Sequence, residues 1–166
     1  MKKLSAILSI CILAITFTGC GPYSFTGIST NAESFQVNFF QNVAPIIVPG
    51  LDRDFTNALQ DLIMNQTSLE LKSQNAQLIY EGEITEWSVT PMSATANQTA
   101  AQNRLTVGVN VRFINTLDSE KDFERKFSFY YDFPATTQVN AVEDAAYEEI
   151  FERITQDIIN ASLADW

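Results

Sequence analysis

Strict alternation between apolar and polar side chains from Arg104 to Ile114 is the feature that most limits the folds open to this chain. Successive side chains of a β-strand point to opposite faces, so every second residue shares a face. One face carries Leu105, Val107, Val109, Val111 and Phe113, and the other carries Arg104, Thr106, Asn110 and Arg112. This pattern predicts a half-buried strand in a sheet.

Two further segments with strand character flank this one, from Gln77 to Val89 and from Phe123 to Phe133. The second of them places five aromatic residues on one face: Phe123, Phe127, Phe129, Tyr131 and Phe133. Asn115 to Glu120 is short enough for a tight connection, whereas Pro91 to Asn103 is a longer polar loop without charge. We therefore predict a three-stranded antiparallel meander with one long hairpin loop.

Two glycines, Gly82 and Gly108, interrupt these predicted strands. Glycine inside a strand weakens packing and often marks a bulge or the close approach of another backbone. A helix that crosses the sheet at these positions is the simplest interpretation.

A further strand is predicted from Ser34 to Phe40. It alternates Phe35, Val37 and Phe39 against polar neighbours, which is the period of a half-buried strand. The sequence leaves open at which edge of the meander this strand pairs.

Two amphipathic helices complete the order of elements. From Leu51 to Thr67, and again from Val139 to Leu163, apolar residues recur at intervals of three and four, which gives each helix one apolar stripe. The order strand, helix, three strands, helix predicts an α+β fold, a two-layer sandwich with two α-helices on one face of a four-stranded sheet. The length supports a single domain over residues 32–166.

The N-terminus has the pattern of a lipoprotein leader. Two lysines precede an uncharged run from Leu4 to Phe17, which is shorter than the roughly 20 residues of a spanning helix. The small residues Thr18 and Gly19 then precede Cys20, whose thiol is the nucleophile needed for lipid attachment. A plain signal peptide with a coincidental cysteine is the alternative interpretation.

Cleavage before Cys20 would divide the chain into a signal peptide over residues 1–19, a lipidated tether over residues 20–31 and the domain. Two or three acyl chains on one cysteine anchor a protein effectively permanently. Gly21 stands where an aspartate would retain a lipoprotein in the inner membrane. We therefore expect an outer-membrane protein whose domain faces the periplasm.

Charge excludes one broad class of partner. Loss of the two leader lysines leaves 8 of the 10 basic residues against 20 acidic ones, a formal charge of −12. Such a surface repels nucleic acid and anionic headgroups alike, so no nucleic-acid partner is expected.

The chain contains no histidine, which removes the commonest general base and the commonest metal ligand. Glu81 and Glu83, two apart on a predicted strand, would lie about 7 Å apart, within the range of paired glycosidase acids. A solvated strand face explains the pair equally simply, and the acidic residues Glu148, Glu149 and Glu152 are typical of a soluble helix surface. No catalytic residue, metal site or cofactor is predicted.

Several segments together resemble the LptE family of lipopolysaccharide-assembly lipoproteins. They are Cys20 to Gly27, Phe39 to Asn42, Phe55 to Leu59, Gln66 to Leu69 and Tyr80 to Ile84. The C-terminal segments are similar to the branch of this family found in Bacteroidetes; they are Val142 to Asp144, Asp157 to Asn160 and Trp166. The resemblance implies two helices on a four-stranded sheet and a non-enzymatic role.

The resemblance also implies partners. Family members plug the large β-barrel of LptD, help it to assemble, and assist insertion of lipopolysaccharide into the outer leaflet. Possible lipopolysaccharide contacts are the basic residues Arg104, Arg112, Lys121, Arg125 and Lys126, for which ordinary surface charge is the alternative explanation. A pilotin or a periplasmic adaptor of another envelope machine would need the same leader and a similar domain.

Overall fold

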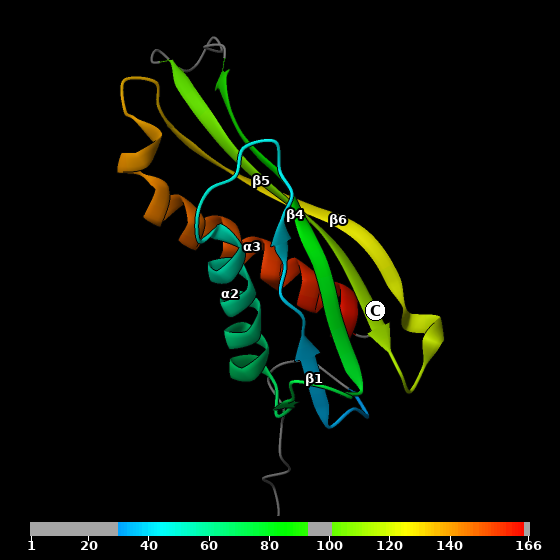
Figure 1. Ribbon diagram of the computed structural model, residues 1–166. Coiled ribbons are helices and arrows are strands. Elements are labelled where there is room, and N and C mark those ends of the chain that lie inside the picture. Colours follow the sequence, from blue (N-terminus) through cyan, green and yellow to red (C-terminus); the bar gives the residue numbers. More distant parts are fainter. Residues whose placement is uncertain (1–29, 93–100, 165–166) are drawn as a thin grey trace, which may run out of the picture.

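The computed structural model describes residues 30–92 and 101–164. The predicted signal peptide, Cys20, nearly all of the tether and Trp166 lie outside the described residues. The described residues form one sheet with two helices on one of its faces (Figure 1). Its strands are β1 (Ser34–Val37), β2 (Gln41–Asn42), β3 (Glu70–Leu71), β4 (Leu78–Met92), β5 (Gln102–Asn115) and β6 (Phe123–Pro134); its helices are α2 (Leu51–Gln66) and α3 (Glu143–Leu163), with short 3-10 turns η1 (Ser119–Lys121) and η2 (Val139–Ala141).

The predicted meander is confirmed. β4 pairs with β5 from Leu78 opposite Asn115 to Met92 opposite Gln102, and β5 pairs antiparallel with β6 along its length. β1 lies beside β4 and runs parallel to it, so the first strand joins the β4 edge of the meander. The strand order is β3-β1-β4-β5-β6, with β2 also paired to β4, and the sheet does not close into a barrel. The α+β fold class is therefore confirmed.

The first predicted strand is shorter than expected. β1 ends at Val37, and the side chain of Phe39 is 55% exposed while Phe40 is fully buried. The break in the strand shifts the alternation by one residue because the Phe40 N–H donates to Oγ1 of Thr56 in α2, at 3.1 Å. The ring of Phe40 also packs edge-on against Phe55, with 5.2 Å between centroids. The expectation that Phe39 shares the buried face was thus wrong.

The sheet has six strands where four were predicted. The two additional strands, β2 and β3, contain two residues each. Strands this short carry no periodicity, so no sequence pattern announces them.

Both helices bury their apolar stripes against the same face of the sheet. α2 buries Leu51, Phe55, Leu59 and Ile63, and α3 buries Ala146, Ile150, Ile154 and Ile158 among others. The alternate apolar residues of β5 are all fully buried beneath them. Gly50, with φ of 88°, makes the turn into α2 in a left-handed conformation that glycine adopts without strain. Among the residues that the structure describes, no helix lies on the opposite face of the sheet (Figure 1).

The two glycines within strands, Gly82 and Gly108, have different structural surroundings. A Cβ at Gly82 would lie 2.0 Å from the backbone oxygen of Asn110, so the neighbouring strand excludes any side chain there. Gly108 lies opposite Glu86, beside a register irregularity between Ile84 and Glu86. The expectation of a helix crossing the sheet at both glycines was wrong, because the backbone that approaches Gly82 belongs to β5 and the atoms nearest Gly108 are the side chains of Lys126 and Glu86.

Candidate functional site

The sheet face without helices presents the polar half of the predicted alternation. We call it the open face; it consists of the outward side chains of β4, β5 and β6. Because the three strands pair in register, outward residues of neighbouring strands lie side by side. Glu81 is opposite Arg112, and Arg112 is opposite Glu124.

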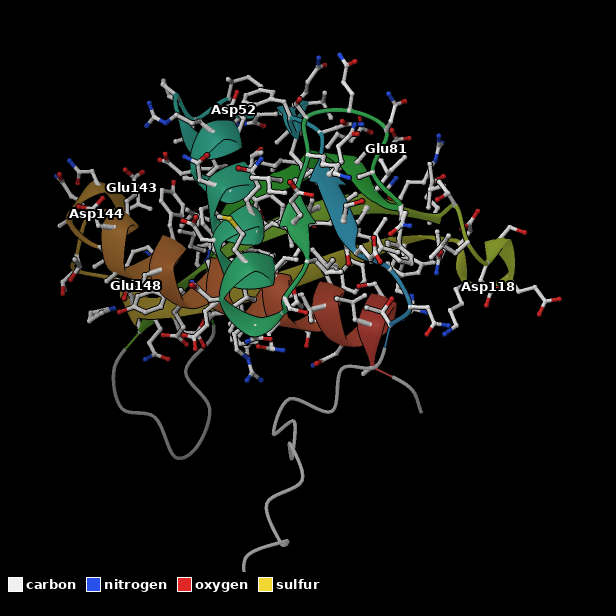
Figure 2. The ribbon with its side chains drawn as sticks, turned by 90° about the horizontal axis from the view of Figure 1, so that it is seen from below. Asp52, Glu81, Asp118, Glu143, Asp144 and Glu148 are labelled. Atoms are coloured by element: carbon white, nitrogen blue, oxygen red, sulfur yellow. The ribbon has the colours of Figure 1, made fainter. Side chains whose placement is uncertain are left out.

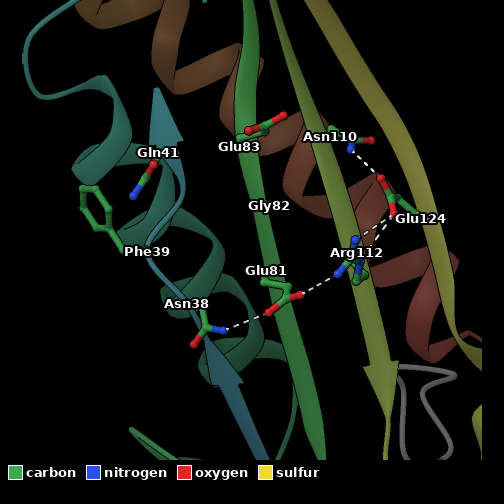
Figure 3. A pocket seen from close by; sticks show the side chains of 9 residues that line it. All are labelled: Asn38, Phe39, Gln41, Glu81, Gly82, Glu83, Asn110, Arg112 and Glu124. Atoms are coloured by element: carbon green, nitrogen blue, oxygen red, sulfur yellow. Dashed lines mark hydrogen bonds and ion pairs between the residues drawn. The ribbon is translucent and has the colours of Figure 1, made fainter. Parts of the chain in front are cut away.

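A shallow hollow of about 430 Å³ lies on the open face beside β1 and β2 (Figure 3). At its centre, Arg112 donates to Glu81 at 3.3 Å and to Glu124 at 3.2 Å. Asn38 donates to the other Glu81 oxygen at 3.2 Å, and Asn110 donates to Glu124 at 2.9 Å. The hydrogen bond from Asn110, followed by that from Arg112, lowers the pKa of Glu124. Each of these carboxylates is thus held by cationic or amide donors of the same chain.

Arg104 and Lys126 are engaged in the same way. Arg104 donates two hydrogen bonds to Asp132, of 2.7 and 2.8 Å, and its guanidinium carbon lies 3.5 Å from the ring centroid of Tyr130. The hydrogen bond lowers the pKa of Asp132 and raises that of Arg104. Lys126 reaches across Gly108 to Glu86, with 2.6 Å between Nζ and the carboxylate oxygen. Three predicted basic residues therefore share the open face, each paired with a carboxylate.

The other two predicted basic residues lie elsewhere. Lys121 closes the 3-10 turn η1 that precedes β6. Arg125 is on the opposite face of β6 from Lys126, and its guanidinium carbon lies 5.6 Å from the ring centroid of Phe123 and 6.0 Å from that of Phe127. The five residues therefore do not form one basic patch, and whether they contact a ligand stays a prediction.

The open face is poorly suited to catalysis or metal binding. Both oxygens of Glu81 accept hydrogen bonds, from Asn38 and Arg112, so this carboxylate serves the structure of the face. Across residues 30–92 and 101–164, no three His, Cys, Asp or Glu side chains are grouped to hold a metal ion. Acidic side chains are also spread widely, from Asp52 on α2 to Asp118 beside η1 and Glu148 on α3 (Figure 2). No single cluster dominates the electrostatics.

Sequence reasoning missed two features of the surface. Arg153 of α3 lies with its guanidinium carbon 5.2 Å from the ring centroid of Phe129, beside the same edge strand as Arg125. The loop after β2 exposes Ile46 and Ile47, with 51% and 60% of their surfaces accessible. The absence of any charged residue from Ser34 to Leu51 is the signal that could have indicated this loop.

The fold and its open face agree with a family comparison that covers most of the domain. The family model for LptE, described as lipopolysaccharide-assembly, matches residues 32–162. The chain belongs to the LptE family. Membership implies a role in lipopolysaccharide assembly and a lipoprotein without enzymatic activity, of a type typically anchored in the outer membrane. The hydrolase hypothesis based on Glu81 and Glu83 is therefore discarded.

Solved structures with the same arrangement of elements are distant in sequence. The hypothetical protein CT253 from Chlamydia trachomatis aligns with a TM-score of 0.55 and 10% identity, over 81% of the LptE-family chain and 99% of that chain. The rare lipoprotein B from Shewanella oneidensis aligns with a TM-score of 0.47 and 8% identity, over 76% and 89% of the two chains. Of these two, only CT253 is similar enough to support the fold of the present chain. At 10% identity it supports the fold and says nothing about function.

A search of curated protein sequences finds no match to this LptE-family chain. Within the described parts of the chain, neither helix combines the length and the apolar character needed to cross a membrane.

Proposed function

We propose that this LptE-family protein is the plug and assembly partner of an LptD-type β-barrel in the outer membrane, where it serves lipopolysaccharide transport to the outer leaflet. The family match over residues 32–162 is the observation that carries the proposal. The assignment to the branch found in Bacteroidetes is part of it, and rests on the C-terminal segments described above.

The open face supports a role inside a barrel. The interior of an outer-membrane barrel is polar, so a plug must present polar groups without large unpaired charge. On this face Arg104, Arg112 and Lys126 are each neutralised by a carboxylate of the same chain. Such a surface meets a polar wall through shape and hydrogen bonds and needs no opposite charge on the partner.

Direct contact with lipopolysaccharide is the finer part of the proposal. To bind a phosphate, Arg104, Arg112 or Lys126 must exchange a carboxylate partner for the ligand. Arg125 is the best placed of the five predicted basic residues, because its guanidinium lies beside the rings of Phe123 and Phe127. We expect Arg125→Gln to weaken capture of lipopolysaccharide, whereas Arg53→Gln on α2, where Arg53 is paired with exposed Asp54, should not.

Recovery of the full-length protein from solubilised outer membrane tests the main proposal. A large β-barrel should co-purify with it, and depletion of the protein should leave that barrel misassembled and surface lipopolysaccharide defective. A pilotin or periplasmic adaptor would leave the barrel and the lipopolysaccharide normal. Absence of a barrel from the recovered complex would refute the plug.

The anchor is tested separately. Intact mass of the mature protein should show acyl chains on Cys20, and Cys20→Ser should abolish them. Cys11→Ser is the matched control, because this cysteine lies within the predicted leader and its loss should leave the mature mass unchanged. An unmodified Cys20 in the wild-type protein contradicts lipidation.

A further inference from the structure

Charge is distributed unevenly along the domain. Its three longest stretches without Asp, Glu, Lys or Arg are residues 34–51, 87–103 and 133–142. The rest of residues 32–166 carries all the charge of a strongly acidic chain. Charge-free stretches of this length are unusual on a surface that must keep such a protein soluble.

The fold brings part of each of these three stretches to one end of the sheet. β1 and β2 run parallel to β4, so the loop after Asn42 and the final residues of β4 point the same way. Met92, Gln102 and Pro134 are neighbours across the strands at that end, where the link to α3 begins. Figure 1 shows the described chain starting at the opposite end, where Glu33 donates to Gln77 just before β4. We call this the uncharged end; it comprises residues 43–50, 87–92, 101–103 and 133–142.

A hollow of about 590 Å³ opens at the uncharged end, with walls from all three stretches. Its apolar walls are Ile46, Trp87, Val89, Phe133 and Val139, and the remaining lining residues are asparagine, threonine and glutamine. No charged side chain lines it. Ile46, half exposed, stands at the rim, and Ile47 and Val43 beside it are exposed to a similar degree.

This composition is that of a protein interface. The buried centre of an interface is apolar and depleted of charge, and an uncharged polar rim completes it. Contiguous exposed apolar side chains on an otherwise well-charged protein mark a binding surface. We propose that the uncharged end is a docking surface for an uncharged surface of a partner protein, one of whose apolar side chains enters the hollow beside Ile46. The partner is the barrel if the proposed function holds, and the inference deepens that function.

A bilayer is a poorer occupant. Surfaces that lie on membranes pair apolar residues with lysine and arginine, and the uncharged end has neither. Geometry points the same way. Thr30 is ten residues after Cys20, a distance of at most about 35 Å along an extended chain, whereas the 15 residues of β4 extend about 50 Å from that end to the uncharged end. A lipid on Cys20 therefore holds the opposite end of the domain at the membrane.

Photocrosslinking in cells tests the occupant directly. Benzoylphenylalanine is placed at position 46, at position 47, or at position 117 in the full-length protein. Leu117 is the matched control, because it is 52% exposed and lies in the turn after β5, away from the uncharged end. We expect an adduct with a different protein from positions 46 and 47 and none from position 117. A lipid adduct, a dimer of the chain, an internal crosslink or no adduct would each overturn the inference.

Substitution tests the energetics. Ile46→Asp combined with Ile47→Asp should reduce recovery of the partner about tenfold or more, because buried interface anchors dominate binding and a desolvated carboxylate opposes it. Leu117→Asp should leave recovery unchanged, and equal melting midpoints of the two variants would show that both fold. If the double variant recovers as much barrel as the wild type does, the docking surface is refuted but the plug proposal stands. A protein adduct from position 46 without any barrel refutes the plug but retains the docking surface.

Discussion

On the open face, the basic side chains Arg104, Arg112 and Lys126 are each paired with a carboxylate of the same chain. At the uncharged end, Ile46 and Ile47 are exposed and no described neighbour covers them. Both regions are on the surface, but only the basic groups of the open face have interaction partners within the free domain. The ion pairs of the open face therefore contribute to the stability of the fold. The exposed apolar side chains of the uncharged end contribute nothing until a partner buries them.

The largest effect on stability is expected at Gly82 of β4, which lies opposite Val111 and faces the helix-covered core. Gly82→Ala should lower the free energy of unfolding by about 3 kcal/mol, since its Cβ would clash with the backbone of β5. Gly108→Ala should cost less, because its nearest obstacle is the flexible end of Lys126 at 2.8 Å. Urea unfolding of both variants measures the difference. Equal stabilities would mean that the backbone of β5 moves away from Gly82 as readily as the side chain of Lys126 moves away from Gly108.

A smaller effect is expected from the ion pair at Asp132. Arg104 lowers the pKa of Asp132, so the ionised carboxylate adds stability that is fully present above the ordinary aspartate value of about 4. That stability is lost as the pH falls through the lowered value. Asp132→Asn should therefore lower the melting midpoint modestly at neutral pH, and the difference from the wild type should shrink in acid. Glu83→Gln, a change at an exposed carboxylate on the same face, is the control; a pH-independent difference at Asp132 would contradict the assignment.

The smallest effect on stability is expected at the uncharged end. Ile46→Asp should change the free energy of unfolding by no more than about 0.5 kcal/mol, because the side chain is half exposed and few contacts are lost. Urea unfolding checks this value, and the loss should appear in partner recovery instead. A large destabilisation would show that Ile46 belongs to the core, and would remove the contrast between the two regions.

Much of the fold followed from periodicity. The alternation in β5 and the helical spacing of α2 and α3 each report one buried face, and the structure confirms all three elements. The prediction of the first strand failed at Phe39 because a hydrogen bond to Thr56 and the contact with Phe55, both distant in sequence, reset the alternation. A local pattern cannot contain such a long-range contact.

The candidate site was predictable only in part. Arg104 and Arg112 were correctly placed on one strand face, but their engagement by Asp132, Glu81 and Glu124 depends on strand register. Arg125 and Lys126 lie on opposite faces simply because adjacent residues of a strand alternate, which the sequence alone could have shown. Spacing along the chain does not reveal which carboxylate neutralises which base.

The sequence by itself determined the types of the long strands and of both described helices, the acidic charge and the absence of histidine, since composition and period are local properties of the chain. Only the tertiary structure decided that β1 joins the β4 edge in parallel and that three charge-free stretches meet around one hollow. The reason is physical: pairing and burial are settled by contacts between residues far apart in sequence. The meaning of the charge-free stretches therefore became visible only when the folded sheet brought them to the same end.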